Sequence, residues 1–243
     1  MPKDTTKWYA EWFNTPYYHS LYKNRDDSEA KKFMDNLTQH LSLQTDETIL
    51  DLACGKGRHS RYLNSLGYQV TGVDLSKNSI DFAKQHENER LEFAVHDMTQ
   101  VYPQQFNVIF NLFTSFGYFE KEEDNLNTIK AIKSNLKTNG IGVIDFMNVN
   151  YVIDNLVPSE TKTIEGVTYT ISRFVENGFI NKEINFIDQG DVFTFTERVK
   201  AIKLDEFKAY FETAGLTLLE IYGDYNLTKF NTASSPRLIM IFQ

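Results

Sequence analysis

T-I-L-D-L-A-C-G-K-G, residues 48–57, is the stretch of sequence that decides the fold. Its first five residues form a short apolar run interrupted by Asp51, a pattern typical of a strand that is buried on both faces. Gly55 and Gly57 follow in a tight turn, and residues 58–66 have the pattern of a helix. Because glycine lets backbone approach a ligand closely at a helix N-terminus, this order predicts the opening of a nucleotide-binding βαβ unit.

Length and composition indicate a globular protein with one large α/β domain or two small ones. The chain has 243 residues, of which 41% are hydrophobic, enough for a substantial core. No apolar run approaches the roughly 18 residues of a membrane span, and the N-terminus lacks a signal-peptide pattern, so we expect a cytoplasmic protein without a membrane partner. The single cysteine, Cys54, agrees with a reducing compartment. A net charge of −8 disfavours nucleic acid as a partner.

Residues 1–44 are predicted to form a separate N-terminal region that begins with an aromatic-rich arm. The spacing of the aromatic residues fits one face of a short helix that is broken near Pro16. This helix either packs on the domain or covers a ligand, and both can be true. A second helix is expected through Leu41, with Ser28 as its N-cap. The aromatic residues of the arm are Trp8, Tyr9, Trp12, Phe13, Tyr17, Tyr18 and Tyr22.

Strands and helices alternate after the glycine turn. Strands are expected at 69–73, 91–95, 106–112 and 141–147, with helices at 78–86 and 122–136 between them. Ser76 is predicted to cap the first of these helices, and Gly140 to end the second as its C′ residue. Such alternation predicts a parallel sheet that binds ligands at the carboxyl ends of its strands.

Asp74 follows the second strand, about 20 residues after the glycine turn. A carboxylate in that place can accept hydrogen bonds from both hydroxyls of a ribose. The alternative role of an N-cap is already taken by Ser76, so the spacing favours a ribose contact.

The pattern changes between residues 151 and 203. Several β-type runs occur there without a helical period, and Asn177-Gly178 predicts a type I′ hairpin turn. These antiparallel strands are expected either to face a bound substrate or to form a homodimer contact through their phenylalanines. A helix at 204–214 and strands at 216–222 and 238–242 then complete the chain.

Taken together, these motifs resemble the class I S-adenosylmethionine-dependent methyltransferases. Asp51, Gly55 and Gly57 match the first motif of that family, Asp74 matches the acid after the second strand, and Asp97-Met98 match the pair after the third. Ala53 and Lys56 depart from the usual small or glycine residues of the first motif. The resemblance implies an α/β fold: a Rossmann-like, seven-stranded, mostly parallel sheet with a terminal antiparallel hairpin and an inserted antiparallel β segment. The core would comprise residues 45–150 and 204–243.

The resemblance also implies S-adenosylmethionine as cofactor, and no metal ion is expected. Backbone groups of residues 53–57 would hold its methionine portion, with Asp51 near its ammonium or a loop amide and either Arg58 or His59 near its carboxylate. Asp74 would bind the ribose and Asp97 the adenine amine, while the arm would cover the sulfonium. The full set of expected cofactor residues is Asp51, Ala53, Cys54, Gly55, Gly57, Arg58, Asp74, Leu75, Asp97, Met98, Asn111, Tyr17 and Tyr22.

Two alternatives to this enzyme class stay open from the sequence. One is an NAD(P)-dependent oxidoreductase, although Ser60 replaces the third glycine of that fingerprint and Asp51 would repel a pyrophosphate. The other is a protein that binds S-adenosylmethionine without catalysis.

A small-molecule acceptor is expected, methylated on oxygen or nitrogen by in-line displacement. The segment 111–114, Asn-Leu-Phe-Thr, differs from the Asn-Pro-Pro-aromatic pattern that resembles enzymes acting on adenine or glutamine. Cys54 belongs to the cofactor turn, so it is not available as the nucleophile that pyrimidine carbon methylation requires. Candidate general bases are His19, His96 and Tyr118.

Overall fold

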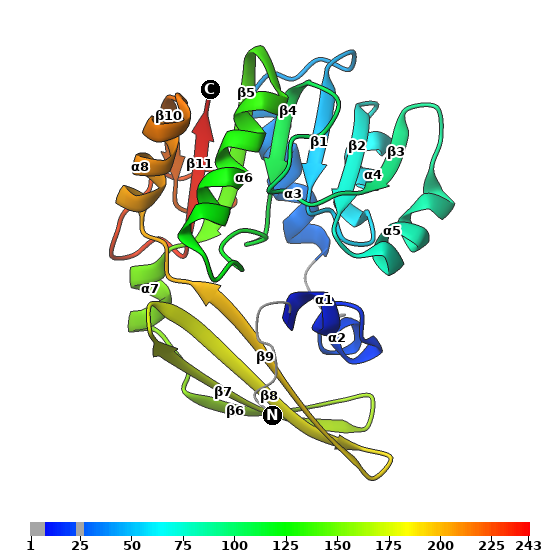
Figure 1. Ribbon diagram of the computed structural model, residues 1–243, viewed down its shortest axis with the longest axis vertical. Helices are drawn as coiled ribbons and strands as arrows, with labels where there is room; N and C mark the ends of the chain where they lie inside the picture. The colour runs from blue at the N-terminus through cyan, green and yellow to red at the C-terminus, as the bar shows by residue number, and fades with distance from the viewer. Residues whose placement is uncertain (1–7, 23–26) are drawn as a thin grey trace.

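The computed structural model describes residues 8–22 and 27–243 and contains two β-sheets. The large sheet has seven strands in the order β10-β11-β5-β4-β1-β2-β3 (Figure 1). Their bounds are β1 Thr48–Leu52, β2 Gln69–Asp74, β3 Leu91–Val95, β4 Phe106–Asn111, β5 Leu136–Met147, β10 Leu218–Tyr222 and β11 Arg237–Phe242. β11 pairs antiparallel with both neighbours, while the pairs from β5 to β3 are parallel. The predicted mostly parallel sheet with a terminal antiparallel hairpin is therefore confirmed.

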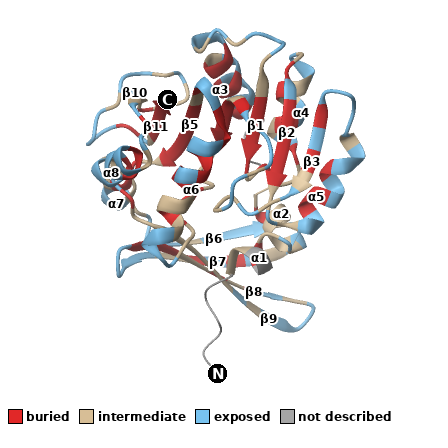
Figure 2. Ribbon diagram, turned by 45° about the horizontal axis from the view of Figure 1, so that its top comes forward, coloured by how far each residue is buried: buried red, intermediate tan, exposed pale blue. Residues whose placement is uncertain are grey.

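Helices cover both faces of the large sheet because its strands are apolar on both sides. On β1, Leu50 and Leu52 face a core that includes residues of α6 and α8, whereas Ile49 faces a core that includes α3, α4 and α5. Figure 2 shows the sheet interior buried between these layers. The helices are α3 Asp27–His40, α4 Arg58–Ser65, α5 Lys77–Ala83 with the 3₁₀ turn η2 Lys84–His86, α6 Glu122–Asn135 and α8 Leu204–Ala214.

The inserted segment forms a separate four-stranded antiparallel sheet in the order β6-β7-β8-β9. Its three hairpins each turn through two residues with positive φ, as type I′ turns require. The predicted Asn177-Gly178 turn is confirmed, with φ values of 52° and 78°, and Glu165-Gly166 and Gln189-Gly190 form the other two. The strands are β6 Ser159–Ile164, β7 Val167–Glu176, β8 Phe179–Asp188 and β9 Asp191–Lys200.

The described part of the N-terminal arm packs on this smaller sheet. Its two helices, α1 Trp8–Trp12 and α2 Pro16–Leu21, lie between the carboxyl edge of the large sheet and the small sheet (Figure 1). Trp12 and Leu21 share a buried cluster with Tyr169, Ile184 and neighbouring rings of the sheet. The arm therefore covers the face of the small sheet that carries Phe186, Phe193 and Phe195, three of the phenylalanines that predicted a dimer contact. The remaining residues of the predicted arm, 1–7 and 23–26, lie outside the described residues.

Two local predictions are corrected. Helix α6 ends at Asn135, within one residue of its predicted end, but Gly140 is not its C′ residue, because Leu136 already pairs with Phe106 as a strand residue. Asn139, with φ 64°, makes the left-handed turn within β5 that was assigned to glycine. Helix α3 begins at Asp27, so the predicted N-cap Ser28 lies inside its first turn. An additional helix, α7 Val149–Asp154, precedes the small sheet, and no helix of the described residues is long and apolar enough to span a membrane.

Candidate active site

A cavity of about 510 Å³ opens at the carboxyl ends of β1, β2 and β3, between the large sheet and the arm. Its floor is the turn after β1, in which Ala53, Gly55 and Gly57 all have positive φ. A Cβ atom at Gly57 would lie 2.5 Å from the Phe93 ring, so only glycine fits there. A Cβ at Gly55 would meet nothing within 4 Å, which leaves its backbone open to a ligand. Gly57 itself lies behind this surface and does not line the cavity.

Asp51 is the buried acid beneath the turn. It is 3% exposed, and its Oδ2 atom accepts a 2.5 Å hydrogen bond from the Ser60 hydroxyl. Burial raises the pKa of Asp51 to about 6; the charge of Asp74 acts in the same direction, and the Ser60 hydrogen bond opposes it. Cys54 is buried beside it, and burial raises the pKa of this thiol, which disfavours a nucleophilic role.

Asp74 connects the turn to the next helix. Its Oδ2 accepts a hydrogen bond from the Gly55 N–H and its Oδ1 one from the Ser76 N–H, each 2.8 Å long. Burial raises the pKa of Asp74, while these two bonds act in the opposite direction. Ser76 caps α5 by accepting a bond from the Ser79 N–H, as predicted, and it also donates to Asn14 of the arm. The half-buried carboxylate lines the cavity.

Asp97, Met98 and Leu75 line the same end of the cavity. The exposed Asp97 accepts hydrogen bonds at Oδ1 from the backbone and hydroxyl of Thr99, which is the turn-forming role of an aspartate. In the described part of the chain, its Oδ2 has no hydrogen-bond partner, so this oxygen is available to an amine of a ligand. Arg58 also lines the cavity, and its guanidinium lies 2.9 Å from the His59 ring nitrogen.

Aromatic rings form the wall opposite the turn. Tyr118 is the centre of this wall, because its ring packs at 5.3 Å from Trp8, 6.3 Å from Tyr9 and 5.7 Å from Phe13. We call this half of the cavity the distal half; it is lined by Trp8, Tyr9, Phe13, Tyr18, His19, Tyr22, Tyr118, Phe119, Glu197 and Val199.

The three candidate bases all line the cavity, but their hydrogen bonds differ. The Tyr118 hydroxyl donates to the Thr114 carbonyl at 2.6 Å, so its proton is already engaged. The His96 Nε2 atom lies 2.9 Å from the Gln100 carbonyl, which can only accept, so this nitrogen carries hydrogen. Burial lowers the pKa of His19, and the Lys56 charge lowers it further. The lowered pKa keeps the His19 imidazole neutral at pH 7, which is the form that a general base requires.

Besides Gly57, two predicted cofactor residues lie outside the cavity. Tyr17 points to the small sheet, where its hydroxyl donates to Asp188 at 2.8 Å and its ring packs on Phe186. Asn111 is completely buried behind the turn, and its Nδ2 donates to the Leu52 carbonyl at 3.0 Å. Helical spacing could not separate Tyr17 from Tyr18 and Tyr22, both of which do line the cavity. Asn111 supports the turn and does not line the cavity.

Two polar residues of the site, Ser60 and Glu197, were not predicted from the sequence. Ser60 was considered only as a replacement for glycine, yet its hydroxyl holds Asp51. Glu197 lies on the inward face of β9 together with Phe193, Phe195 and Val199. An acid at alternating spacing among apolar residues is a signal that could have identified it.

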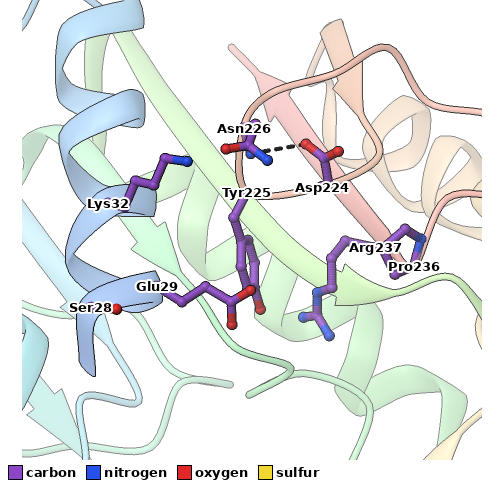
Figure 3. Close-up of a pocket in the computed structure, with 8 residues that line it drawn as sticks. All are labelled: Ser28, Glu29, Lys32, Asp224, Tyr225, Asn226, Pro236 and Arg237. Carbon is purple, nitrogen blue, oxygen red and sulfur yellow. Dashed lines mark hydrogen bonds between the residues drawn. The ribbon is translucent and has the colours of Figure 1, made fainter. Parts of the chain in front are cut away.

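A second cavity, of about 530 Å³, lies between α3 and the loop before β11. Figure 3 shows the Tyr225 ring between Glu29 and Arg237 in this cavity. Arg237 forms an ion pair with Asp145. Burial acts to raise the pKa of Asp224, but hydrogen bonds to its carboxylate and the nearby charge of Lys32 together lower it. Both cations that line this cavity, Lys32 and Arg237, therefore already lie near carboxylates.

The donor set of the first cavity fits S-adenosylmethionine. Asp51 and the open backbone at Gly55 suit the ammonium and carboxylate of an amino acid, and Asp74 suits a ribose. The free Asp97 oxygen and the apolar side chains of Leu75 and Met98 suit an adenine ring. All of these groups lie along one continuous cavity, as a single extended ligand requires.

Comparisons with known proteins agree with this fit. The family described as "Methyltransferase domain" matches residues 49–140. The putative methyltransferase YqeM of Bacillus subtilis (strain 168) is 28% identical over 209 residues, which cover 81% of this chain and 84% of that protein. The glycine/sarcosine N-methyltransferase of Aphanothece halophytica is 25% identical over 212 residues, covering 84% and 77% respectively.

Solved structures share the fold. The crystal structure of an S-adenosylmethionine-dependent methyltransferase from Clostridium acetobutylicum ATCC 824 aligns with a TM-score of 0.77 and 21% identity, covering 93% of this chain and 95% of that one. Strand order, matched family and relatives lead to the same conclusion: this chain belongs to the class I S-adenosylmethionine-dependent methyltransferases.

Proposed function

We propose that this enzyme methylates an oxygen or nitrogen atom of a small molecule bound in the distal half of the cavity. This proposal rests on one observation: a single cavity of about 510 Å³ is lined by the glycine turn, by the aromatic wall and by His19, whose pKa is lowered. A volume of this size suits a cofactor and a small acceptor. The relative from Aphanothece halophytica is itself named for small substrates, glycine and sarcosine, which supports this class of acceptor.

We assign the two substrates to different parts of the chain. Residues 45–150 and 204–243 would hold the cofactor through Asp51, the 53–57 turn, Asp74 and Asp97. The arm, within residues 1–44, and the insertion, residues 151–203, would hold the acceptor. Support comes from Tyr9, Phe13 and Tyr18 of the arm and from Glu197 and Val199 of β9, all of which line the distal half.

Methyl transfer requires alignment, exclusion of water and, for an acidic or protonated acceptor, removal of a proton. The bound cofactor supplies a methyl group on a sulfonium; the acceptor lone pair bonds to its carbon while the carbon–sulfur electron pair returns to sulfur. The aromatic wall restricts the acceptor to one orientation and excludes water. His19 would take the proton that the acceptor atom loses.

A screen of small amines, alcohols and phenols with methyl-labelled S-adenosylmethionine tests the proposal. We expect labelled product with at least one class, and tight binding of S-adenosylmethionine and S-adenosylhomocysteine by calorimetry. Binding of both sulfur compounds without turnover of any acceptor would favour a non-catalytic binding protein. Binding of NAD in preference to both would contradict the cofactor assignment.

A further inference from the structure

We propose that the acceptor is an amine, held as an ammonium ion by the carboxylate of Glu197 within the aromatic wall of the distal half; its proton passes to His19 before the freed nitrogen lone pair bonds to the methyl carbon. This inference rests on the proposed function and names the substrate class of the same cavity. It follows from where the charge of Glu197 lies and which groups already contact it.

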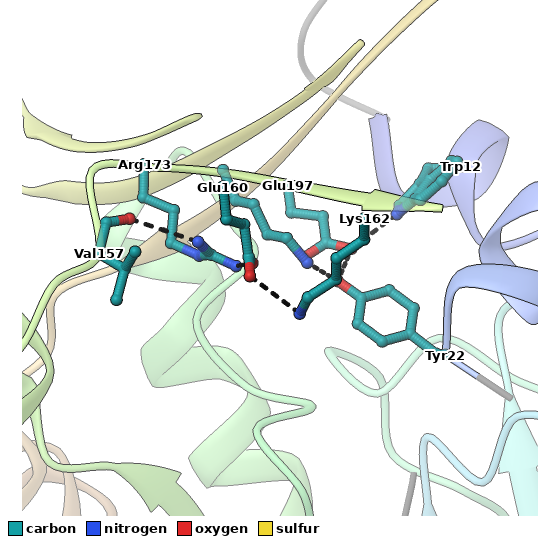
Figure 4. A network of polar contacts seen from close by, with 8 residues as sticks. Trp12, Tyr22, Val157, Glu160, Lys162, Arg173 and Glu197 are labelled. Carbon is teal, nitrogen blue, oxygen red and sulfur yellow. Dashed lines mark hydrogen bonds and ion pairs between the residues drawn. The ribbon is translucent and has the colours of Figure 1, made fainter. Parts of the chain in front are cut away.

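The two oxygens of Glu197 have different surroundings. Oε1 accepts hydrogen bonds from the Trp12 indole N–H at 2.8 Å and from the Tyr22 hydroxyl at 2.5 Å (Figure 4). Both donors are neutral, and the Tyr22 hydroxyl in turn accepts a hydrogen bond from the Lys182 ammonium. Lys182 is the only cation near Oε2 among the described residues; its Nζ forms an ion pair with this oxygen at 3.6 Å, longer than a charge-assisted hydrogen bond.

The charge of Glu197 faces the cavity, and its counter-ion does not. Glu197 and Tyr22 line the cavity, whereas Lys182 is absent from the lining and lies 4.5 Å from the centroid of the Tyr22 ring. Glu160 on the same sheet gives a contrast, because it is engaged by both Arg173 and Lys162 and lies outside the cavity (Figure 4). A ligand in the cavity therefore meets the Glu197 carboxylate, which has one long ion pair, whereas Glu160 has two shorter ones.

The rings around Glu197 suit the same class of ligand. Aromatic faces attract cations through the negative potential above the ring, and this attraction increases when water is excluded. The distal half offers the rings of Trp8, Tyr9, Phe13, Tyr18 and Tyr118. The lining cations, Lys56 and Arg58, belong to the turn and the first residue of α4, where the cofactor carboxylate is expected. Among the described residues that line the distal half, none is a lysine or an arginine, so an anionic acceptor would have no cationic partner in the lining, while an ammonium has both a carboxylate and rings.

Glu197→Gln removes the charge and keeps the local structure. The glutamine Oε1 can still accept from Trp12 and Tyr22, so the arm keeps its contact with β9. Glu160→Gln makes the same chemical change on the same sheet outside the cavity, and Trp12→Phe removes a hydrogen bond of the arm without removing the carboxylate. Together these variants separate loss of charge from loss of packing.

Binding is measured with tetramethylammonium, benzylamine and its neutral counterpart benzyl alcohol. Protein saturated with S-adenosylhomocysteine is titrated by calorimetry and by fluorescence of its two tryptophans, Trp8 and Trp12. We expect benzylamine to bind about tenfold or more tightly than benzyl alcohol, and tetramethylammonium to compete with it. Glu197→Gln should remove about tenfold of amine affinity and leave alcohol affinity unchanged, while Glu160→Gln and Trp12→Phe keep the amine preference.

Three results would overturn the inference: equal binding of amine and alcohol, no binding of either cation at millimolar concentration, or an amine preference that survives Glu197→Gln. Calorimetry with S-adenosylmethionine tests the proposed function separately: if this compound does not bind, the proposed function is wrong. In that case the titrations are repeated without S-adenosylhomocysteine, and the amine preference of the cavity is still decided.

Discussion

The Arg237 guanidinium donates to the Asp145 Oδ1 atom at 2.8 Å and joins the first residue of β11 to the end of β5. Asp145 is completely buried, and its Oδ2 accepts from the Phe113 N–H. Arg237 also donates to the Thr114 hydroxyl. Phe113 and Thr114 both have positive φ, at 59° and 60°, a strained conformation that these bonds stabilise. Because Phe113 lines the cofactor cavity, the ion pair shapes one of its walls.

Arg237→Met should reduce the free energy of unfolding by about 3–5 kcal/mol, since it leaves the buried Asp145 carboxylate without a counter-ion. Urea unfolding measures this change. Lys77→Met is the control, because it breaks the exposed pair of Lys77 with Asp81 and should cost less than about 1 kcal/mol. Combining Arg237→Met with Asp145→Asn should restore part of the loss. If Arg237→Met and Lys77→Met reduced the free energy of unfolding by the same amount, Arg237 would not be the counter-ion on which the buried Asp145 depends.

Asp51→Asn should make the protein more stable at pH 8 and weaken cofactor binding. Burial raises the pKa of Asp51 from 3.8 to about 6, so the folded chain binds this proton more tightly than the unfolded chain. Its contribution to stability is therefore most favourable at low pH, falls as pH rises from about 4 to 6, and costs about 3 kcal/mol above that range.

Urea unfolding at pH 8 and pH 5 tests this sign, with the exposed Asp81→Asn as control. The gain from Asp51→Asn should be larger at pH 8, and calorimetry should show weaker S-adenosylmethionine binding. A gain that is equal at both values of pH would contradict the raised pKa of Asp51.

Local patterns predicted the part of the site that lies in the core. The apolar run before Asp51, the positive-φ positions Gly55 and Gly57, and the Ser76 cap of α5 are each determined by a few neighbouring residues. Periodicity is visible in such segments without knowledge of distant contacts.

Contacts between residues far apart in the chain explain why the roles of several arm residues could not be predicted from the sequence. Trp12 meets Glu197 across 185 positions, and Tyr17 meets Asp188 across 171, so spacing along the arm cannot reveal which ring faces the cavity. The same contacts decide how the arm can be tested. Deletion of residues 1–22 would expose the buried Tyr169, Ile184 and Phe186 of the small sheet. Single substitutions in the arm are the better test.

Asp74→Ala should lose at least tenfold in S-adenosylmethionine affinity. A hydrogen bond to a charged group contributes roughly 1.5–3 kcal/mol, and about 1.4 kcal/mol corresponds to a factor of ten. The variant also frees the Gly55 and Ser76 N–H groups, so the turn itself loosens. Asp74→Asn keeps one acceptor oxygen and should lose less. Calorimetry compares both variants with the control Asp81→Ala on α5. If Asp74→Ala binds S-adenosylmethionine as tightly as the wild type does, Asp74 does not bind the ribose.

His19→Gln should remove the acidic limb of the pH profile of kcat/KM. Burial and the neighbouring Lys56 lower the pKa of His19 below its ordinary 6.5, so the imidazole stays neutral and able to accept a proton at pH 7. For the same reason, Lys56→Met should move this limb to higher pH, although only in part because burial is the larger cause. Imidazole NMR titration checks the pKa directly, and His86→Gln, outside the cavity, serves as control. If the limb stays unchanged in His19→Gln, another group accepts the proton; if it stays unchanged in Lys56→Met, the lysine charge does not act on His19.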